Sequence, residues 1–150
     1  MGNLLEEDMK KSAEELNFVY RRMRDAVQKY GSASPFDYLV VTNSCNLCIE
    51  CKQLKGGSSG KPKSIAFSRV SEAQRKGLLT WDKMDINKCY ILVNFRWIDG
   101  NKGKLFALDI KEFLYLEYEL DRKSIPLDYF EENTLEIPRY GKGWDLRLLQ

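Results

Sequence analysis

The sequence predicts an α/β fold with a mixed central β-sheet flanked by helices. Apolar segments rich in β-branched and aromatic residues alternate with longer amphipathic segments, and this alternation is typical of α/β proteins. The predicted order is helix, two strands, helix, two strands and helix, followed by an irregular tail. At 150 residues the chain is long enough to bury a core without disulfide bonds, so we expect a single domain covering residues 1–150.

The N-terminal part is predicted to form a helix and a strand pair. Residues 4–30 contain neither proline nor glycine and place apolar side chains three and four positions apart. This spacing predicts an amphipathic helix, which Gly31 would end. Residues 36–42 and 47–53 are strand-like and have a turn signal between them, so they are predicted to form a hairpin.

The rest of the chain is predicted to add a loop, two helices and two strands. These are a loop at 55–63, a helix at 71–84, strands at 89–97 and 104–108, and a short helix at 110–119. Ser71 is expected to cap the first of these helices, because a serine hydroxyl accepts a hydrogen bond from an N–H group at a helix start.

The absence of histidine restricts the chemistry open to this chain. Hydrolases with Ser-His-Asp or Cys-His groups, histidine-based zinc hydrolases and histidine-dependent nucleases all need an imidazole. Any catalysis must therefore rest on carboxylates, lysines or thiolates.

Two further patterns bear on location and partners. No apolar run approaches the length of a membrane span, and the start MGNLLEEDMKK is acidic where a signal peptide is basic. We therefore expect a cytoplasmic protein without membrane contact. The net charge is +6 over residues 52–76 and −6 over residues 109–136, and a concentrated basic segment is typical of a surface that binds a polyanion.

The stretch CNLCIECKQLKGG, which begins at Cys45, carries two competing signals. Its cysteines have the spacing of a metal thiolate site, while Glu50 and Lys52 place a carboxylate and an ammonium two positions apart. On a strand, Cys48 would share a face with Glu50 and Lys52, and Cys51 would lie on the other face. This alternation separates the thiols and keeps the two charges together.

A second carboxylate, Asp37, lies in the preceding predicted strand. Two carboxylates from adjacent strands provide hard oxygen ligands for Mg²⁺ or Mn²⁺, and a bound metal with a nearby lysine suits phosphodiester hydrolysis. None of this chemistry needs histidine.

The pattern P-x-D followed by E-x-K resembles the PD-(D/E)xK nuclease superfamily, which has a restriction-endonuclease-like core. Within it, the chain is most similar to the RecU-type Holliday junction resolvases. The residues that carry this likeness are the acidic helix start after Gly2, Asp37-Tyr38, Ile49-Glu50-Cys51-Lys52, Phe67, Gln74 and the core strand from Cys89.

The resemblance implies a Mg²⁺-dependent (or Mn²⁺-dependent) endonuclease that cleaves branched double-stranded DNA and acts as a homodimer. The implied metal ligands are Glu6, Asp37, Glu50 and the backbone carbonyl of Cys51. The implied catalytic group consists of Asp37, Glu50, the lysine Lys52 and Gln74, which would lie near the scissile phosphate.

Basic residues after the E-x-K strand are predicted to contact DNA phosphates without reading sequence. They are Lys55, Lys61, Lys63, Arg69, Arg75 and Lys76.

One feature departs from the family pattern and two alternatives stay open. RecU-type enzymes have a longer segment between the first helix and the Asp-Tyr strand, for which only residues 31–36 are available if that helix runs to residue 30. The chain could therefore be another PD-(D/E)xK nuclease of nicking or restriction type. It could also be a non-catalytic nucleic-acid-binding module with a structural zinc ion. The ligands of that zinc would be Cys45, Cys48, Cys51 and Cys89.

Overall fold

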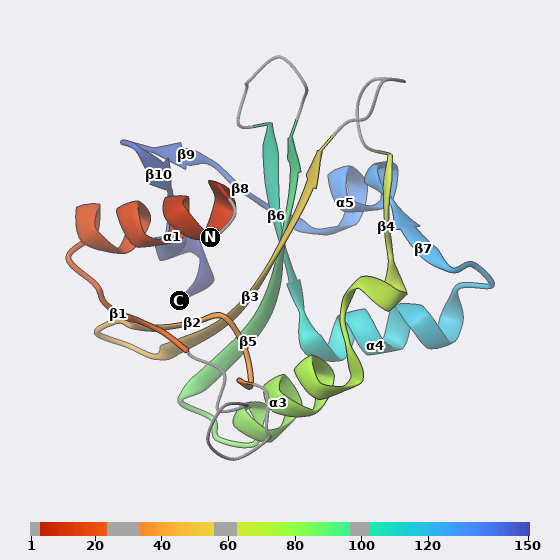
Figure 1. Cartoon of the computed structure of the whole chain (residues 1–150), viewed down its shortest axis with the longest axis horizontal. Coiled ribbons are helices and arrows are strands. Elements are labelled where there is room, and N and C mark those ends of the chain that lie inside the picture. The colour runs from red at the N-terminus through yellow and green to blue at the C-terminus, as the bar shows by residue number, and fades with distance from the viewer. Residues whose placement is uncertain (1–3, 24–33, 56–62, 97–102) are drawn as a thin grey trace.

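The computed structural model describes residues 4–23, 34–55, 63–96 and 103–150. Its centre is a six-stranded sheet with the order β1-β2-β3-β5-β6-β8 (Figure 1). The strands of this sheet are β1 (Val19–Arg22), β2 (Tyr38–Val41), β3 (Asn46–Lys55), β5 (Asn87–Arg96), β6 (Lys104–Asp109) and β8 (Leu135–Ile137). The helices are α1 (Leu4–Glu15), α3 (Glu72–Asp82), α4 (Ile110–Glu119) and α5 (Leu127–Asn133).

Short elements complete the fold. They are the 3-10 turns η1 (Phe67–Arg69) and η2 (Leu146–Leu149), the strand pair β4 (Ser64–Ala66) and β7 (Ser124–Pro126), and the strand pair β9 (Arg139–Tyr140) and β10 (Gly143–Trp144).

The main sheet is mixed. β3 and β5 are parallel over their whole length, whereas the other neighbouring strands are antiparallel. A parallel pair needs a crossover connection, and α3 lies in that connection between β3 and β5. The predicted α/β class with a mixed sheet and flanking helices is therefore confirmed.

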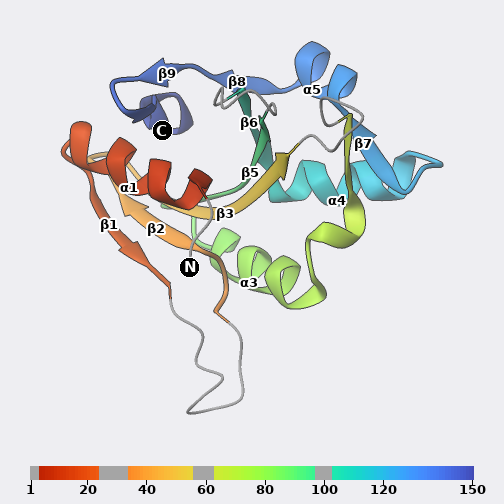
Figure 2. The same ribbon diagram turned by 45° about the horizontal axis from the view of Figure 1, so that its top comes forward.

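Each face of the sheet buries its own apolar cluster. Leu78 of α3, Phe113 of α4 and Phe130 of α5 pack on one face. Leu5 and Met9 of α1 pack on the other face, together with β10 and η2. Figure 2 shows β3 running between α1 and α3. The central strands of the sheet are therefore buried on both faces.

The segment containing β10 is fastened to α1 by buried polar contacts. The Trp144 backbone N–H donates to Ser12 Oγ at 2.7 Å, and the Trp144 indole N–H donates to Asp8 Oδ2 at 3.3 Å. Asp8 also forms a buried ion pair with Arg96 of β5. Because a buried charge is stable only when it is paired and hydrogen-bonded, these contacts depend on one another.

The predicted helix over residues 4–30 is wrong beyond Glu15. Asn17 adopts a left-handed φ of 57°, and the Phe18 N–H donates to the Ala13 carbonyl at 2.9 Å, which closes the helix end. The chain then forms β1, which pairs with β2. Residues 16–36 therefore separate α1 from Asp37, so the assumed spacer of only residues 31–36 is wrong, and the comparison with the RecU-type pattern stays a prediction.

The expectation of an irregular tail is wrong as well, since residues 124–149 contain α5, η2 and four short strands. These strands are two or three residues long, too short for a periodic sequence signal. Their formation depends on the partners they meet, as when β8 pairs with β6 at the sheet edge.

Other predicted elements are confirmed with small shifts at their ends. β2 and β3 form the predicted hairpin, β5 and β6 form the second strand pair, and α4 has its predicted bounds. Of the predicted loop 55–63, residues 56–62 lie outside the described residues, as does Trp97. Within the described part of the chain, no helix is both long and apolar enough to span a bilayer.

Candidate active site

Strand alternation places Glu50 and Lys52 on the face of β3 that α3 covers. Cys48 and Leu54 point to the same side of β3 as Glu50 and Lys52, and they belong to the apolar cluster on that face. Ile49 and Cys51 point to the other side and belong to the other cluster. Glu50 is only 2% exposed. Its Oε2 lies 3.4 Å from Lys52 Nζ, so the buried carboxylate has a cation beside it.

Backbone pairing with β3 fixes the position of Asp37, directly before β2. The Asp37 N–H donates to the Ile49 carbonyl at 3.0 Å, and the Asp37 carbonyl accepts from the Met23 N–H at 2.8 Å. The Asp37 carboxylate accepts from the Cys51 N–H at 2.8 Å through Oδ2. Its carboxyl group is also hydrogen-bonded to that of Glu50. The two carboxyl groups therefore meet on the same face of the sheet.

This environment favours the protonated form of Glu50. The pKa of Glu50 is raised from 4.5 to about 8: burial is the largest cause, the negative charge of Asp37 adds to it, and Lys52 acts in the opposite direction. Two carboxyl groups in contact resist simultaneous ionisation unless a cation joins them. The pair therefore has the electrostatic character of a cation site.

Gln74 connects this pair to α3. Ser71 caps the helix, as predicted: its Oγ accepts from the Gln74 N–H, while Gln74 Oε1 accepts from the Ser71 N–H. The same Oε1 accepts from Lys52 Nζ at 3.2 Å, and Gln74 Nε2 donates to Glu50 Oε2 at 3.2 Å. A capping box therefore holds the side chain that bridges Lys52 and Glu50.

Close packing of α3 also positions the segment before Asp37. A Cβ atom on Gly77 would lie 2.3 Å from the carbonyl oxygen of Pro35 and 2.5 Å from its Cα. The neighbouring Phe36 ring packs edge-on against Trp81 of the same helix, with 5.1 Å between ring centroids. The absence of a side chain at Gly77 therefore lets the Pro35 backbone approach α3.

We predict that Gly77→Ala lowers the free energy of unfolding by about 1–3 kcal/mol, the usual cost of inserting a methyl group into filled space. It should also slow any catalysis that depends on Asp37, because the Pro35 backbone must move. Denaturant unfolding checks the first effect, with Thr80→Ala on the exposed side of α3 as the matched control. Equal stability of the two variants would mean that the Pro35 backbone leaves room for a methyl group at position 77.

The four cysteines do not converge. Cys48 and Cys89 are paired across β3 and β5 on the α3 side, while Cys45 and Cys51 lie on the α1 side. All four thiols are buried. A hydrogen bond with Cys48, together with burial, raises the pKa of the Cys89 thiol. The sheet itself separates the thiols, so this fold does not assemble the four-cysteine zinc site considered as an alternative.

Glu6 does not join Asp37 and Glu50. Its helix packs on the opposite face of the sheet, held there by its apolar side chains, and Glu6 pairs with Arg22 of β1 at 3.2 Å. Within residues 4–23, 34–55, 63–96 and 103–150, no group of three or more His, Cys, Asp or Glu side chains could hold a metal ion. The structure therefore brings two carboxyl groups together at the site, and the role of Glu6 as a third ligand stays a prediction. The Cys51 thiol also faces away, and the role of its carbonyl stays a prediction.

The predicted DNA-contacting residues differ in their surroundings. Lys55 and Lys63 are exposed, Lys76 forms an exposed ion pair with Glu72, and Lys61 lies outside the described residues. Arg69 is exposed and donates to the Gln53 carbonyl at 3.4 Å.

Arg75 has internal partners. Its guanidinium forms an ion pair with Glu117, donates to the Phe67 and Val70 carbonyls, and lies over the Phe113 ring. These contacts tie α3 to α4 and give Arg75 a structural role that the basic run of the sequence did not reveal.

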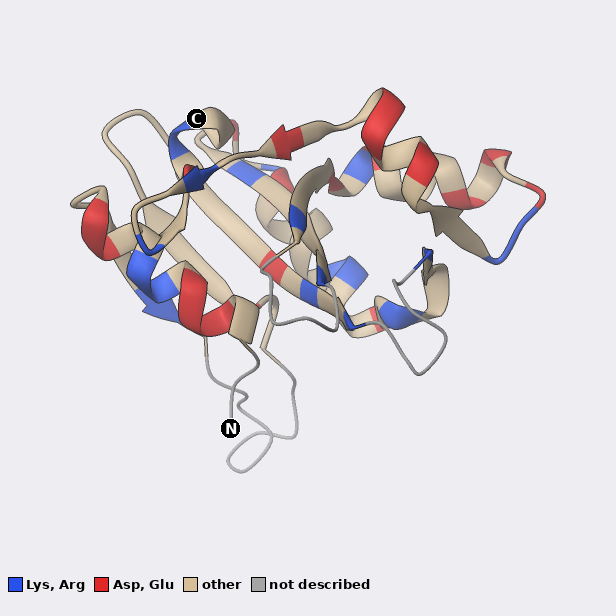
Figure 3. Cartoon of the chain, turned by 90° about the horizontal axis from the view of Figure 1, so that it is seen from above, with Lys and Arg blue, Asp and Glu red and all other residues tan. Residues whose placement is uncertain are grey.

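The segment 109–136 is acidic overall, yet the fold brings one of its basic residues, Arg122, close to the predicted DNA-contacting residue Lys63. β4 pairs with β7, and Arg122 lines a cavity of about 420 Å³ together with Lys63. Asp128 of α5 lines this cavity too, and further acidic side chains lie on α5 and on the strand that follows it (Figure 3). No local sequence pattern predicts the placement of Arg122, because strand pairing over about sixty residues produces it.

Comparison with known proteins supports the fold. No protein-family model and no curated protein sequence matches the chain. Among solved structures, it is similar to Hjc, a Holliday junction resolvase of the archaeal hyperthermophile Archaeoglobus fulgidus, with a TM-score of 0.56. The match covers 90% of this chain and 95% of the resolvase, at 17% sequence identity. The chain therefore shares the restriction-endonuclease-like fold of that structure.

Proposed function

We propose that this protein is a Mg²⁺-dependent DNA endonuclease that cleaves branched DNA, in the manner of a Holliday junction resolvase. The observation that supports the chemistry is the buried contact among Asp37, Glu50, Lys52 and Gln74. The shared fold with an archaeal junction resolvase supports branched DNA as the substrate.

The donor set fits Mg²⁺, or Mn²⁺ in its place. Mg²⁺ is usually held by one or two carboxylates together with water and substrate phosphate oxygens, and Asp37 with Glu50 provides two carboxyl groups in contact. The pKa of Glu50 is raised first by burial and then by the negative charge of Asp37, and a bound cation would offset both effects. Bound there, the ion would supply Lewis-acid polarisation of a phosphodiester.

The remaining groups act on charge and position. Lys52 places an ammonium beside the carboxylates, where it offsets negative charge that develops on the phosphate during hydrolysis. Gln74 holds this ammonium through its Oε1 and holds Glu50 through its Nε2. The capping box of α3 keeps both contacts in register, which reduces the reorganisation needed during reaction.

A cleavage assay tests the proposal. A four-way junction, a flap and a linear duplex are each incubated with the protein in Mg²⁺ or in EDTA. Mg²⁺-dependent cleavage that is fastest on the junction is expected. A rate on linear duplex equal to the junction rate would favour a restriction-type or nicking nuclease, and no cleavage of any DNA would refute the nuclease proposal. Analytical ultracentrifugation with junction DNA tests the proposed homodimer, which would offer two sites to opposed strands.

Lys55 and Lys63 are exposed at the two ends of residues 56–62 and should bind phosphates. Lys55→Ala with Lys63→Ala should weaken binding to all DNA forms alike and reduce the slope of log affinity against log salt by about two, roughly one for each lysine. Fluorescence anisotropy over a salt series measures this. Lys10→Ala with Lys11→Ala, two exposed lysines of α1, removes the same charge as a control. An equal slope change in both double variants would contradict a local role.

A further inference from the structure

A cavity separate from the carboxylate pair opens beside α3. It has a volume of about 410 Å³ and lies between the β1 edge and the helix. Its lining residues are Arg21, Arg22, Met23, Leu39 and Trp81. This volume falls within the range of small-molecule pockets in proteins, and none of the groups assigned to the cleavage chemistry lines it.

The cavity adjoins the proposed site along two elements. Leu39 and Asp37 are two positions apart on the same extended segment and therefore project from the same side of the sheet. Trp81 and Gln74 are seven positions apart on α3, which is about two helical turns or roughly 10 Å along its axis. A ligand in the cavity would therefore lie close to the carboxylate pair, about two turns of α3 away from Gln74.

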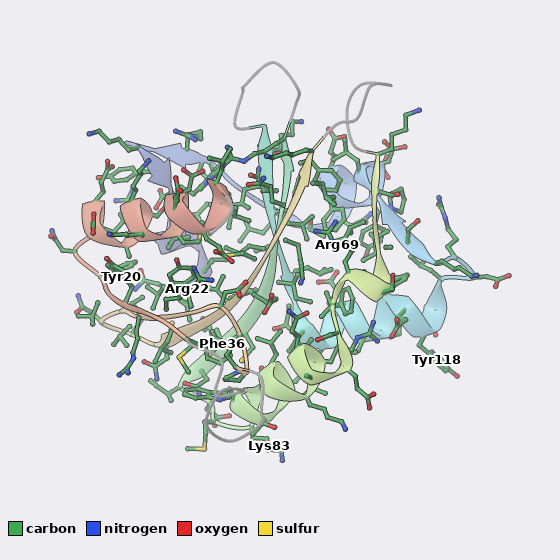
Figure 4. All side chains as sticks on the ribbon, viewed as in Figure 1. Tyr20, Arg22, Phe36, Arg69, Lys83 and Tyr118 are labelled. Carbon is green, nitrogen blue, oxygen red and sulfur yellow. The ribbon has the colours of Figure 1, made fainter. Side chains whose placement is uncertain are left out.

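The contact of Phe36 with Trp81 links the two regions directly. Figure 4 labels both Arg22 and Phe36: Arg22 lies toward α1, in line with its ion pair to Glu6, and Phe36 lies nearer α3. The region between the proposed site and the cavity is thus packed protein, held by the Pro35 backbone against Gly77.

The lining combines two kinds of chemistry. Met23, Leu39 and Trp81 form an apolar wall that includes an indole ring, on which a planar base could stack. Arg21 and Arg22 bring guanidinium groups that bind phosphate oxygens. Arg22 already pairs with Glu6, whereas Arg21 is exposed and has no ion-pair partner within the described part of the chain. Arg21 is therefore the residue available to a new anion.

We propose that this cavity binds one unpaired nucleotide of the DNA substrate, adjacent to the cleaved phosphodiester. Its base would stack against Trp81, and its phosphate would pair with Arg21. Bases inside a continuous duplex are already stacked and paired and cannot enter, whereas an unpaired base at a branch point can. The inference rests on the proposed function and refines the substrate to a DNA branch at which one nucleotide is unpaired in the complex, next to the site of cleavage.

Photocrosslinking tests the position of the base. A branched DNA carries 5-iodo-deoxyuridine at its single unpaired position, and the same modified base stands in a fully paired duplex as the control. Irradiation of the wild-type complex in EDTA should crosslink the unpaired base to the peptide that contains Trp81, as read by mass spectrometry. A crosslink confined to other aromatic residues would overturn the proposal.

Affinity measurements provide a second readout with an exposed variant that should fold normally. Arg21→Ala should weaken binding of DNA with an unpaired nucleotide by about tenfold, near the effect of losing one hydrogen bond to a charged group, while the affinity for a paired duplex changes little. Trp81→Phe should retain most of the preference because it keeps a ring, whereas Trp81→Leu should lose it. Lys10→Ala on α1 controls for net charge. If Arg21→Ala weakens both DNAs equally, the arginine is a general phosphate contact and the cavity proposal fails.

These outcomes separate the cavity from the nuclease activity. A Trp81 crosslink without cleavage in Mg²⁺ would support the nucleotide site and refute the proposed function. Cleavage without this crosslink, and with no selective effect of Arg21→Ala, would refute the nucleotide site and leave the nuclease proposal standing.

Discussion

Replacing Lys52 with alanine should reduce the rate of DNA cleavage by about 100-fold to 1,000-fold, the usual effect of removing one preorganised group that stabilises developing charge. Lys52 Nζ lies 3.4 Å from Glu50 Oε2 and is held by Gln74, so the loss is local. Single-turnover cleavage of a four-way junction in saturating Mg²⁺ gives the rate constant directly.

Binding must be measured separately, because a lysine near phosphate also contributes to affinity. We expect the affinity of Lys52→Ala for junction DNA in EDTA to fall far less than the cleavage rate. Lys52→Arg keeps the charge but changes the geometry at Gln74, so it should recover binding more fully than cleavage. A Lys52→Ala enzyme that cleaves at the wild-type rate would remove this side chain from the chemistry.

Glu50→Gln should abolish cleavage and stabilise the metal-free protein at alkaline pH. The folded state binds the Glu50 proton more tightly than the unfolded state, because the folded pKa is about 8 and the ordinary value is 4.5. The wild-type protein therefore carries no ionisation cost at Glu50 below about pH 4.5, loses stability as the pH rises from there to about 8, and bears the full cost above that. At about 1.4 kcal/mol per pKa unit, the cost is on the order of 5 kcal/mol at pH 9.

A neutral glutamine removes this cost while keeping the shape of the side chain. The measurement is the difference in unfolding free energy between Glu50→Gln and wild type at about pH 5 and pH 9, in EDTA, by denaturant titration. The difference should favour the variant and grow with pH. Glu72→Gln, at an exposed carboxylate on α3, is the matched control and should show no such trend. A difference independent of pH would mean that folding does not raise the pKa of Glu50.

Local patterns in the sequence were sufficient for the central part of the fold. Alternation along residues 46–55 correctly separated Glu50 and Lys52 from Cys51, because the side-chain period of two is fixed by strand geometry. The same reasoning placed Ser71 at a helix start, where its hydroxyl and Gln74 form the capping box. Apolar strands with clear turn signals, such as those at 87–96 and 104–109, were also recognisable.

Features that depend on tertiary contact could not be read in this way. Residues 19–22 continue an apparent helical pattern, yet they extend because β2 offers an edge to pair with and Asn17 ends α1. The pairing of Glu6 with Arg22 could not be predicted either, because sequence spacing does not state which face of the sheet a helix covers. Arg75 looked like a surface charge because its partner, Glu117, is 42 positions away.

The fastening of Trp144 to α1 has a consequence for how the chain folds during synthesis. The paired residues are 132 and 136 positions apart, so α1 leaves the ribosome long before its cover is made. Until then the apolar side chains of α1 stay partly exposed. Contacts between such distant positions are also slow to form. The N-terminal helix therefore completes its packing late. A nascent chain stalled before residue 144 would present an exposed apolar, protease-sensitive helix to chaperones.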